Sequence, residues 1–200
     1  DGRRLAKATF TATQHGNHTA EERSVIIPTR AAAMIERAIP TISDRTVDIA
    51  CRLNDVLVRV GEVEFFARLV DGRYPNWRQV IPKNVDTGFT LIPTGSLSSL
   101  IRQAAITTDR ESRGVDFQLI NGEIVLESST AEVGEARVRM PCEIDGEDQK
   151  ATLDNRYVLD FCKVIDAEEN VHFGLNSNGP CRMMAGDDYI YIVMPMARDS

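Results

Sequence analysis

The feature that most constrains this chain is a pattern of predicted elements that occurs three times. In each copy a short strand leads into a helix, and three strands follow the helix. The helices are predicted to begin near residues 29, 94 and 155, a spacing of roughly 60 residues that is typical of an internal repeat. Residue identity between the copies is low, so the repeat is inferred from element order and spacing. Antiparallel, strand-rich units of this kind predict an α+β fold with the helices collected on one face.

Apolar alternation and turn dipeptides set the predicted bounds. The strands are predicted at 4–12, 46–53, 56–60, 63–69, 88–92, 114–120, 123–128, 135–142, 150–153, 171–175, 181–184 and 189–196. The helices are predicted at 30–38, 95–107 and 154–165, with Thr29, Thr94 and either Asp154 or Asn155 as N-caps. Asn121-Gly122 is the strongest hairpin signal in the chain.

Two copies of the pattern make a domain of about 120 residues, an ordinary domain size. Residues 78–200 hold one complete pair, and residues 1–77 hold the second half of an earlier pair. We therefore predict two domains, 1–77 and 78–200, and expect the chain to be a fragment of a longer protein. Between them, residues 71–82 form a connector with Pro75, Pro82 and the only Trp, Trp77. The two prolines predict an extended, stiff segment.

Composition is that of an ordinary globular protein, with 42% hydrophobic and 26% charged residues and a net charge of −7. No apolar run approaches the roughly 20 residues that a membrane-spanning helix needs. The charge is uneven, because residues 1–77 carry a net +1 and residues 78–200 a net −8. A nucleic-acid binder is usually basic overall, so any DNA contact requires a local basic face. The four widely spaced cysteines predict free, buried thiols in a reducing compartment.

The sequence offers no positive argument for an enzyme. His15 and His18 are the only close histidine pair, and they lack a third ligand, so we expect a solvated loop and no metal. His172 falls in a predicted strand and Cys162 on a predicted helix, and no nucleophile–base arrangement follows from their spacing. Phosphate-binding, dinucleotide-binding and zinc-protease motifs are absent from the sequence. We expect neither catalysis nor a cofactor.

The C-terminal segment Tyr189–Met196 is apolar at every position, and four of the six methionines lie in the last 18 residues. A strand with one wet face would alternate. Two interpretations remain open: a strand covered on both faces, or one whose second face binds an apolar partner. Methionine suits surfaces that accept varied partners.

Four stretches resemble the bacterial sliding-clamp family, the beta subunit of DNA polymerase III. Asp1–Ala6 (DGRRLA) resembles its TDGxRLA signature, and Asp71–Trp77 (DGRYPNW) resembles its DGRFPDY linker. Arg156–Asp160 and Tyr191–Met196 resemble its last helix and C-terminal strand. The four matches fall in the family order and span the chain, so they identify it as the later part of the middle domain followed by the C-terminal domain.

The resemblance implies a DNA-clamp fold and a non-catalytic processivity factor in the bacterial cytoplasm. Two full-length subunits form a ring around double-stranded DNA, with helices lining the hole. The resemblance places Arg30, Arg37, Arg102, Arg156 and Lys163 toward the DNA. The replicative polymerase, the clamp loader and repair proteins insert short Gln/Leu/Phe peptides into a cleft. Carried over by position, that cleft is formed by Gly2, Arg4, Leu5, Pro75, Val80, Tyr157, Ile192, Val193, Met194, Pro195 and Met196.

The chain departs from the family pattern at the polar rim of this cleft. Gln79 and Ala197 stand where the family often has Arg, and Arg3 stands where it often has His. The alternative function is a stand-alone peptide- or protein-binding module without a DNA role. A hydrolase built on Cys162 or His172 is a remote third class.

Overall fold

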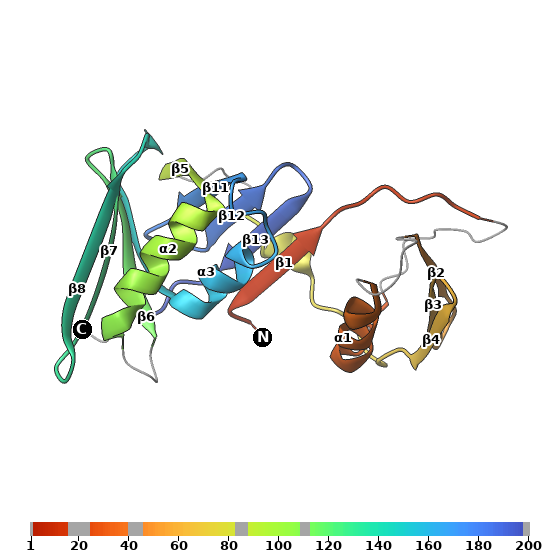
Figure 1. Ribbon diagram of the computed structural model, residues 1–200. Helices are drawn as coiled ribbons and strands as arrows, with labels where there is room; N and C mark the ends of the chain where they lie inside the picture. Colours follow the sequence, from red (N-terminus) through yellow and green to blue (C-terminus); the bar gives the residue numbers. More distant parts are fainter. Residues whose placement is uncertain (1, 16–24, 40–45, 83–87, 109–112, 198–200) are drawn as a thin grey trace. The chain divides into compact units, whose positions relative to one another are not determined.

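The computed structural model describes residues 2–15, 25–39, 46–82, 88–108 and 113–197. It contains two compact units (Figure 1). The first unit combines residues 1–11 with residues 78–200, and the second unit spans residues 12–77. The N-terminal strand therefore folds with the C-terminal part of the chain.

Among its described residues, the first unit contains two sheets and two α-helices. The six-stranded sheet has the order β1-β13-β12-β11-β5-β9, and the four-stranded sheet has the order β10-β6-β7-β8. The helices α2 (Thr94–Ala104) and α3 (Asn155–Cys162) pack against each other. The strands are β1 (Arg4–Ala8), β5 (Gly88–Pro93), β6 (Gly114–Ile120), β7 (Glu123–Thr130), β8 (Gly134–Pro141), β9 (Asp145–Gly146), β10 (Gln149–Asp154), β11 (Asn170–Leu175), β12 (Cys181–Ala185) and β13 (Tyr189–Val193).

The predicted repeat is confirmed, and the sheets show how two copies interlock. In one copy β5 and α2 precede β6, β7 and β8, and in the other β10 and α3 precede β11, β12 and β13. The leading strand of each copy pairs with the other copy: β5 with β11, and β10 with β6. This exchange joins the two copies in one core. Its buried side chains come from both sheets and both helices, among them Leu97, Phe117, Phe161 and Phe173.

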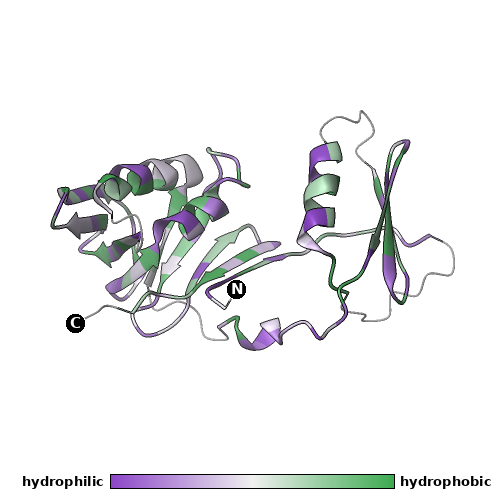
Figure 2. Ribbon diagram, turned by 90° about the horizontal axis from the view of Figure 1, so that it is seen from below, coloured by the Kyte–Doolittle hydropathy of each residue, from purple (hydrophilic) through white to green (hydrophobic). Residues whose placement is uncertain are grey.

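The second unit holds the helix and the three following strands of one copy of the repeat, whereas residues 25–28, just before its helix, do not form the predicted leading strand. Its helix α1 (Thr29–Ala38) is followed by a three-stranded sheet of β2 (Val47–Cys51), β3 (Asp55–Val60) and β4 (Val63–Arg68). The core is small: Val56, Val58 and Val60 are its buried residues. No residue of α1 is buried, whereas α2 and α3 bury several each. Figure 2 shows hydrophobic residues on this helix and on its sheet.

Most predicted elements are confirmed, but four helix ends differ from prediction. Helix α2 ends at Ala104 rather than residue 107 and is followed by the 3-10 helix η3 (Ala105–Thr107). Helices α1 and α2 begin at Thr29 and Thr94 themselves, because Pro28 and Pro93 occupy the N-cap positions. The Thr94 hydroxyl donates instead to the Glu169 carbonyl at 2.9 Å. Asp154 caps α3 as predicted, accepting from the Arg156 N–H at 2.9 Å. Helix α3 ends at Cys162 rather than residue 165, before Asp166 Oδ1 accepts from the Glu168 N–H and starts a turn.

Other bounds differ for reasons visible in the hydrogen bonds. Strand β13 ends at Val193, because Pro195 cannot donate and the Met196 N–H bonds to the Thr152 carbonyl of the other sheet. Strand β1 ends at Ala8, which pairs with Tyr189, the first residue of its partner strand β13. The connector is not extended throughout, since Trp77–Gln79 form a short 3-10 helix. Strand β9 was not predicted. The Asn121-Gly122 hairpin is confirmed, with φ of 52° and 75°.

Among the described residues no helix is long and apolar enough to cross a membrane.

Candidate functional site: the β1–β13 surface

Strand β1 brings the first residues of the chain beside its last strand. The two strands are antiparallel, with Arg4 opposite Val193 and Leu5 opposite Ile192. Successive side chains of a strand point to opposite faces, and directly paired residues share a face. Arg4 therefore lies on one face and Leu5 on the other.

The face that carries Leu5 has apolar residues at its centre, and Arg3 and Lys7 lie on the same face two residues to either side of Leu5. Leu5 is half-buried, and its cross-strand neighbour Ile192 is 1% exposed although it lies outside the main core. The ladder continues to Met194, whose N–H donates to the Arg3 carbonyl at 2.8 Å. Met194 remains 40% exposed. Leu5, Ile192 and Met194 form a continuous apolar strip, which we call the outer strip.

The residues after β13 connect the two sheets of the first unit. The Met196 N–H donates to the Thr152 carbonyl of β10 at 2.8 Å. A Cβ built on Gly114 would lie 3.6 Å from the Met196 sulfur, so this side chain packs against β6. Residues 194–196, the tail, are thus fixed by a backbone hydrogen bond at each end, and Pro195 between them restricts the backbone.

The opposite face of β1 and β13 packs on α3. The Phe161 ring stacks on Tyr189 and contacts Tyr191, with ring centroids 5.8 and 5.6 Å apart. Arg4 Nη1 donates to Asp160 Oδ2 at 2.6 Å, and the guanidinium lies 4.5 Å from the centre of the Tyr157 ring. A cation at this distance over an aromatic face is attracted to it.

Carboxylates balance both cations beside Tyr157. Arg156 donates from Nε to Asp154 Oδ1 at 3.1 Å and from Nη2 to Oδ2 at 2.6 Å. The hydrogen bond to Asp160 raises the pKa of Arg4 above its usual value. Burial alone would raise the pKa of Asp160, but hydrogen bonds from Lys163 and Arg4 outweigh it and lower that pKa. Asp160 therefore stays charged near neutral pH.

The structure brings most of the predicted cleft residues into the first unit, on two faces of one strand pair. Leu5, Ile192 and Met194 form the outer strip, whereas Arg4, Val193 and Tyr157 lie on the α3 side. Val193 is fully buried and is therefore not available to a ligand. Gly2 precedes β1 with φ of 80°, a conformation that favours glycine. Val80 is 41% exposed in the first unit, and Pro75 belongs to the second unit.

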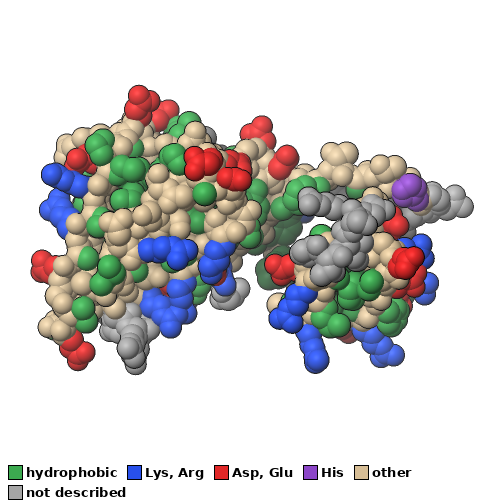
Figure 3. Space-filling view, in the orientation of Figure 1, with side chains coloured by type: hydrophobic (Ala, Val, Ile, Leu, Met, Phe, Trp, Pro, Cys, Tyr) green, Lys and Arg blue, Asp and Glu red, His purple; other side chains and the backbone are tan. Residues whose placement is uncertain are grey.

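The predicted DNA-facing cations lie on the three helices. Arg30 and Arg37 are exposed on α1 of the second unit. In the first unit, Figure 3 shows Lys and Arg side chains gathered over α2 and α3. Lys163 pairs with Asp160 at 2.6 Å and Arg156 with Asp154, so part of this charge is balanced locally. Arg102 Nε donates to the uncharged Ser98 hydroxyl at 3.3 Å.

The described cysteine and histidine that were considered as reactive residues, Cys162 and His172, lie where a structural role explains them. All four cysteines are free, but only Cys162 and Cys181 are buried and Cys51 and Cys142 are half-buried, which corrects the prediction of four buried thiols. Burial raises the pKa of Cys162 to about 11. The His172 ring stacks on Phe89 with centroids 4.1 Å apart. His18 lies outside the described residues, among which no group of three His, Cys, Asp or Glu side chains can hold a metal.

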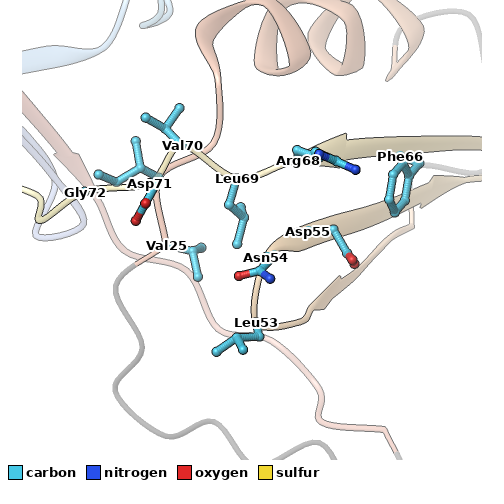
Figure 4. A pocket seen from close by; sticks show the side chains of 11 residues that line it. Val25, Leu53, Asn54, Asp55, Phe66, Arg68, Leu69, Val70, Asp71 and Gly72 are labelled. Carbon is cyan, nitrogen blue, oxygen red and sulfur yellow. The ribbon is translucent and has the colours of Figure 1, made fainter.

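A hollow of about 740 Å³ lies in the second unit (Figure 4). Its lining includes the side chains of Leu53, Phe66 and Val70, which are 77%, 65% and 47% exposed. This hollow, whose lining also includes Asp55, Arg68 and Asp71, was not predicted. Its residues are adjacent in space because the Leu69 N–H bonds to Asn54 and the Val70 N–H to Ile26.

Sequence reasoning also missed Asp160, which holds Arg4 across 156 residues of sequence. Asp160 lies three residues after Tyr157, and residues three or four apart share a helix face. The sequence therefore indicated that these two side chains are neighbours. The partner strand of β1 was not predicted, so the pairing with Arg4 had no basis in the sequence.

Comparison with known proteins gives one consistent relationship. The family profile for the DNA polymerase III beta subunit, central domain, matches residues 1–76, and the C-terminal domain profile matches residues 78–197. The beta sliding clamp of Proteus mirabilis is 28% identical over 199 residues, covering 98% of this chain and 53% of that protein. A Staphylococcus aureus clamp is 30% identical over 152 residues, covering 74% and 40%.

Solved structures agree. The DNA polymerase III beta subunit of Pseudomonas aeruginosa superposes with a TM-score of 0.87 at 28% identity, covering 99% of this chain and 54% of that one. Another Pseudomonas aeruginosa clamp, solved with griselimycin bound, gives 0.86 at 26% identity, covering 99% and 53%. The chain spans about half the length of the relatives it matches. Two successive domain profiles cover it almost completely, and so the chain belongs to the DNA polymerase III beta subunit family, the bacterial sliding clamps.

Proposed function

We propose that this chain is part of a sliding clamp, and that the outer strip is the floor of a cleft that binds partner peptides. Full-length subunits form a two-subunit ring around duplex DNA in the bacterial cytoplasm and tether the polymerase without catalysing a reaction. The observation that carries the proposal is the strip of Leu5, Ile192 and Met194, in a chain that matches two successive clamp domains.

The cleft proposal has a physical basis in shape and chemistry. Peptide sites are apolar with a few polar groups that orient the ligand. Here the outer strip and Val80 supply apolar surface, and the fixed tail residues Pro195 and Met196 supply a rim, whereas Arg4 and Tyr157 lie on the other face of the strand pair. A short partner peptide buries its Leu and Phe side chains on the strip, and the side chain of its Gln forms hydrogen bonds with the rim. One relative has been solved with griselimycin bound, so at least one family member has a ligand site.

The domain assignment follows from the repeat. We propose that residues 1–77 are the later part of the middle clamp domain and residues 78–200 the C-terminal domain. In support, the first unit holds two copies of the repeat and the second holds the helix and three strands of one, in which helix α1 has no buried residue. In the full-length protein a preceding copy covers α1 as α2 covers α3.

DNA contact is proposed for Arg30, Arg37, Arg102, Arg156 and Lys163, by attraction to phosphates without base readout. The ring holds the protein on DNA topologically, so such contacts need not be strong. Full-length protein should remain on nicked circular DNA and dissociate when the circle is cut. The 200-residue chain should not be retained. Salt-resistant retention of the chain itself would contradict this assignment.

Ring closure needs a surface on the first unit, for which we propose the edge strand β8. It is the outermost strand of its sheet, and an edge strand offers unpaired backbone groups to another chain. Ile106, in the 3-10 turn that packs beside β8, is 72% exposed. In the full-length protein, Ile106→Asp should shift dimers to monomers in sedimentation velocity, whereas an unchanged sedimentation coefficient would exclude this edge.

The peptide proposal is tested by calorimetry with a Gln-Leu-Phe-type peptide. We expect a Kd of about 1–100 μM, common for short motifs. Val80→Asp should weaken binding, because it places a charge beside the apolar strip. Absence of heat, with no competition in a fluorescence assay, would refute the cleft. A stand-alone binding module predicts peptide binding but no DNA retention by the full-length protein.

A further inference from the structure

A second hollow, of about 390 Å³, lies in the first unit at the end of the β1–β13 strand pair. Three of its lining residues form a row across the strands, because Ala8 pairs with Tyr189 and Tyr189 pairs with Ala185. Directly paired residues share a face. This is the α3 face, since the Tyr189 ring stacks on Phe161 with centroids 5.8 Å apart. The hollow therefore lies on the face opposite the outer strip.

Apolar side chains that remain exposed to solvent complete the lining. Phe10, two residues beyond the end of β1, is 85% exposed, and Val164, just after α3, is 67% exposed. Ile165 also lines the hollow and packs in part against the core. The volume is near the lower end of the roughly 300–1,000 Å³ typical of ligand pockets. It suits one or two side chains of a partner.

The turn that follows α3 is fixed before any partner binds. The Glu169 carbonyl accepts from the Thr94 N–H and from the Thr94 hydroxyl, each at 2.9 Å. The Ala167 carbonyl accepts from the Gly95 N–H at 2.8 Å. These bonds tie the turn to the start of α2. Because this side of the hollow is already ordered, a ligand does not have to order it.

The border of the hollow is acidic. Five carboxylates lie in the two turns that carry or adjoin its lining residues: Asp166, Glu168, Glu169, Asp187 and Asp188. In the described part of the chain, none of them forms an ion pair, and no Lys or Arg lines the hollow. Lys163 pairs with Asp160, and Lys7 lies on the opposite face of β1 from Ala8. The electrostatic potential at the hollow is therefore negative.

We propose that this hollow is a second docking site, which binds a partner protein through an exposed apolar side chain flanked by Lys or Arg. The apolar lining removes that side chain from water. The surrounding carboxylates attract the flanking cations and repel an acidic segment. The hollow and the outer strip lie on opposite faces, so the proposal does not depend on the peptide cleft.

The test is an NMR titration of the 200-residue chain with the peptide Lys-Lys-Phe-Lys-Lys. One control peptide has Ser in place of Phe, and another has Glu in place of every Lys. Methyl signals of Ala8, Val164 and Ala185 report on the hollow. We expect saturable shifts with a Kd of about 0.1–1 mM, and none with either control peptide. Binding should weaken at about 1 M salt, because exposed charges are then screened.

Two variants change the hollow without removing a backbone hydrogen bond. Val164→Ala removes part of the exposed apolar lining and should weaken binding about three- to tenfold. The double variant Glu168→Gln with Glu169→Gln removes two carboxylates and keeps the carbonyl that accepts from Thr94. It should weaken binding about two- to tenfold and reduce the salt dependence.

Matched control variants lie elsewhere in the first unit. Ile106→Ala trims a side chain that is 72% exposed, in the 3-10 helix after the far end of α2. Glu132→Gln with Glu135→Gln removes two exposed carboxylates at the β7–β8 turn. Both controls should leave the Kd unchanged.

Three results would overturn the proposal. Equal binding of the Phe and Ser peptides would show charge attraction without an apolar site. An unchanged Kd in Val164→Ala or in the Glu168/Glu169 variant would place the peptide elsewhere. No binding by the full-length protein would show that the rest of the subunit covers the hollow. A Gln-Leu-Phe-type peptide should shift the signals of Met194 and leave those of Val164 unchanged, so a failure of the cleft is distinguishable from a failure of this site.

Discussion

Replacing Met194 by alanine should weaken peptide binding by a factor set by its exposure. Full burial of a Met side chain contributes about 1.5–3 kcal/mol. Met194 is 40% exposed, so a peptide that covers it adds two fifths of that amount, roughly 0.6–1.2 kcal/mol. The variant should therefore bind about three- to eightfold more weakly.

The same substitution should have a modest effect on folding. The part of the Met194 side chain that is already buried in the free chain contributes about 0.9–1.8 kcal/mol to the free energy of unfolding, on the same scale of burial energy. The midpoint of urea unfolding should fall, but the chain should remain folded at 25 °C. Calorimetry on the folded variant then reports binding alone.

Ile192→Ala is the matched control on the same strip. Ile192 is 1% exposed, so a ligand gains almost no further burial from it, while truncation leaves a cavity. We expect a loss of about 2–5 kcal/mol in unfolding free energy and little change in Kd for the folded fraction. If Met194→Ala left Kd unchanged, or Ile192→Ala left stability unchanged, the assignment of exposed and buried strip residues would be wrong.

Three further results are expected. At pH 8 iodoacetamide should alkylate Cys162 about 100-fold more slowly than an exposed thiol, because burial raises its pKa to about 11; rapid labelling of Cys162 in the native chain would contradict its burial. Ser128→Ala should cost about 1–3 kcal/mol of stability, because Thr107 and the Ala104 carbonyl lose a buried partner, and urea unfolding measures this. Asp160 stabilises the fold above its unfolded pKa, and this stabilisation is lost as the pH falls through its lowered folded pKa; unfolding midpoints of wild type and Asp160→Ala should therefore converge in acid.

The sequence predicts the local elements well because their signals are local. Pro-Thr at 28–29 and 93–94 marks the start of a helix, and Asn121-Gly122 supplies two residues that tolerate positive φ. The N-caps of α1 and α2 were misassigned by one residue, since proline with φ near −60° can precede a helix without a side-chain capping bond. The repeat followed from these local signals.

Pairings between distant segments could not be predicted in the same way. Strand β1 pairs with β13, which lies near the other end of the chain. An alternating strand pattern does not specify which edge of which sheet the strand joins. The resemblance placed Arg4, Leu5 and Met194 in one cleft, but the two faces of the strand pair, and the role of Asp160, depend on register. A shift of one residue would exchange the faces of Arg4 and Leu5.

The most direct test of the account is a calorimetric titration of the 200-residue chain, and of its Met194→Ala variant, with a Gln-Leu-Phe-type peptide. We predict saturable binding with a Kd of about 1–100 μM, and about three- to eightfold weaker binding by the variant, because the peptide loses about two fifths of the Met burial energy. No binding to the wild-type chain, or equal binding by both proteins, would contradict the assignment of the β1–β13 surface as the peptide cleft.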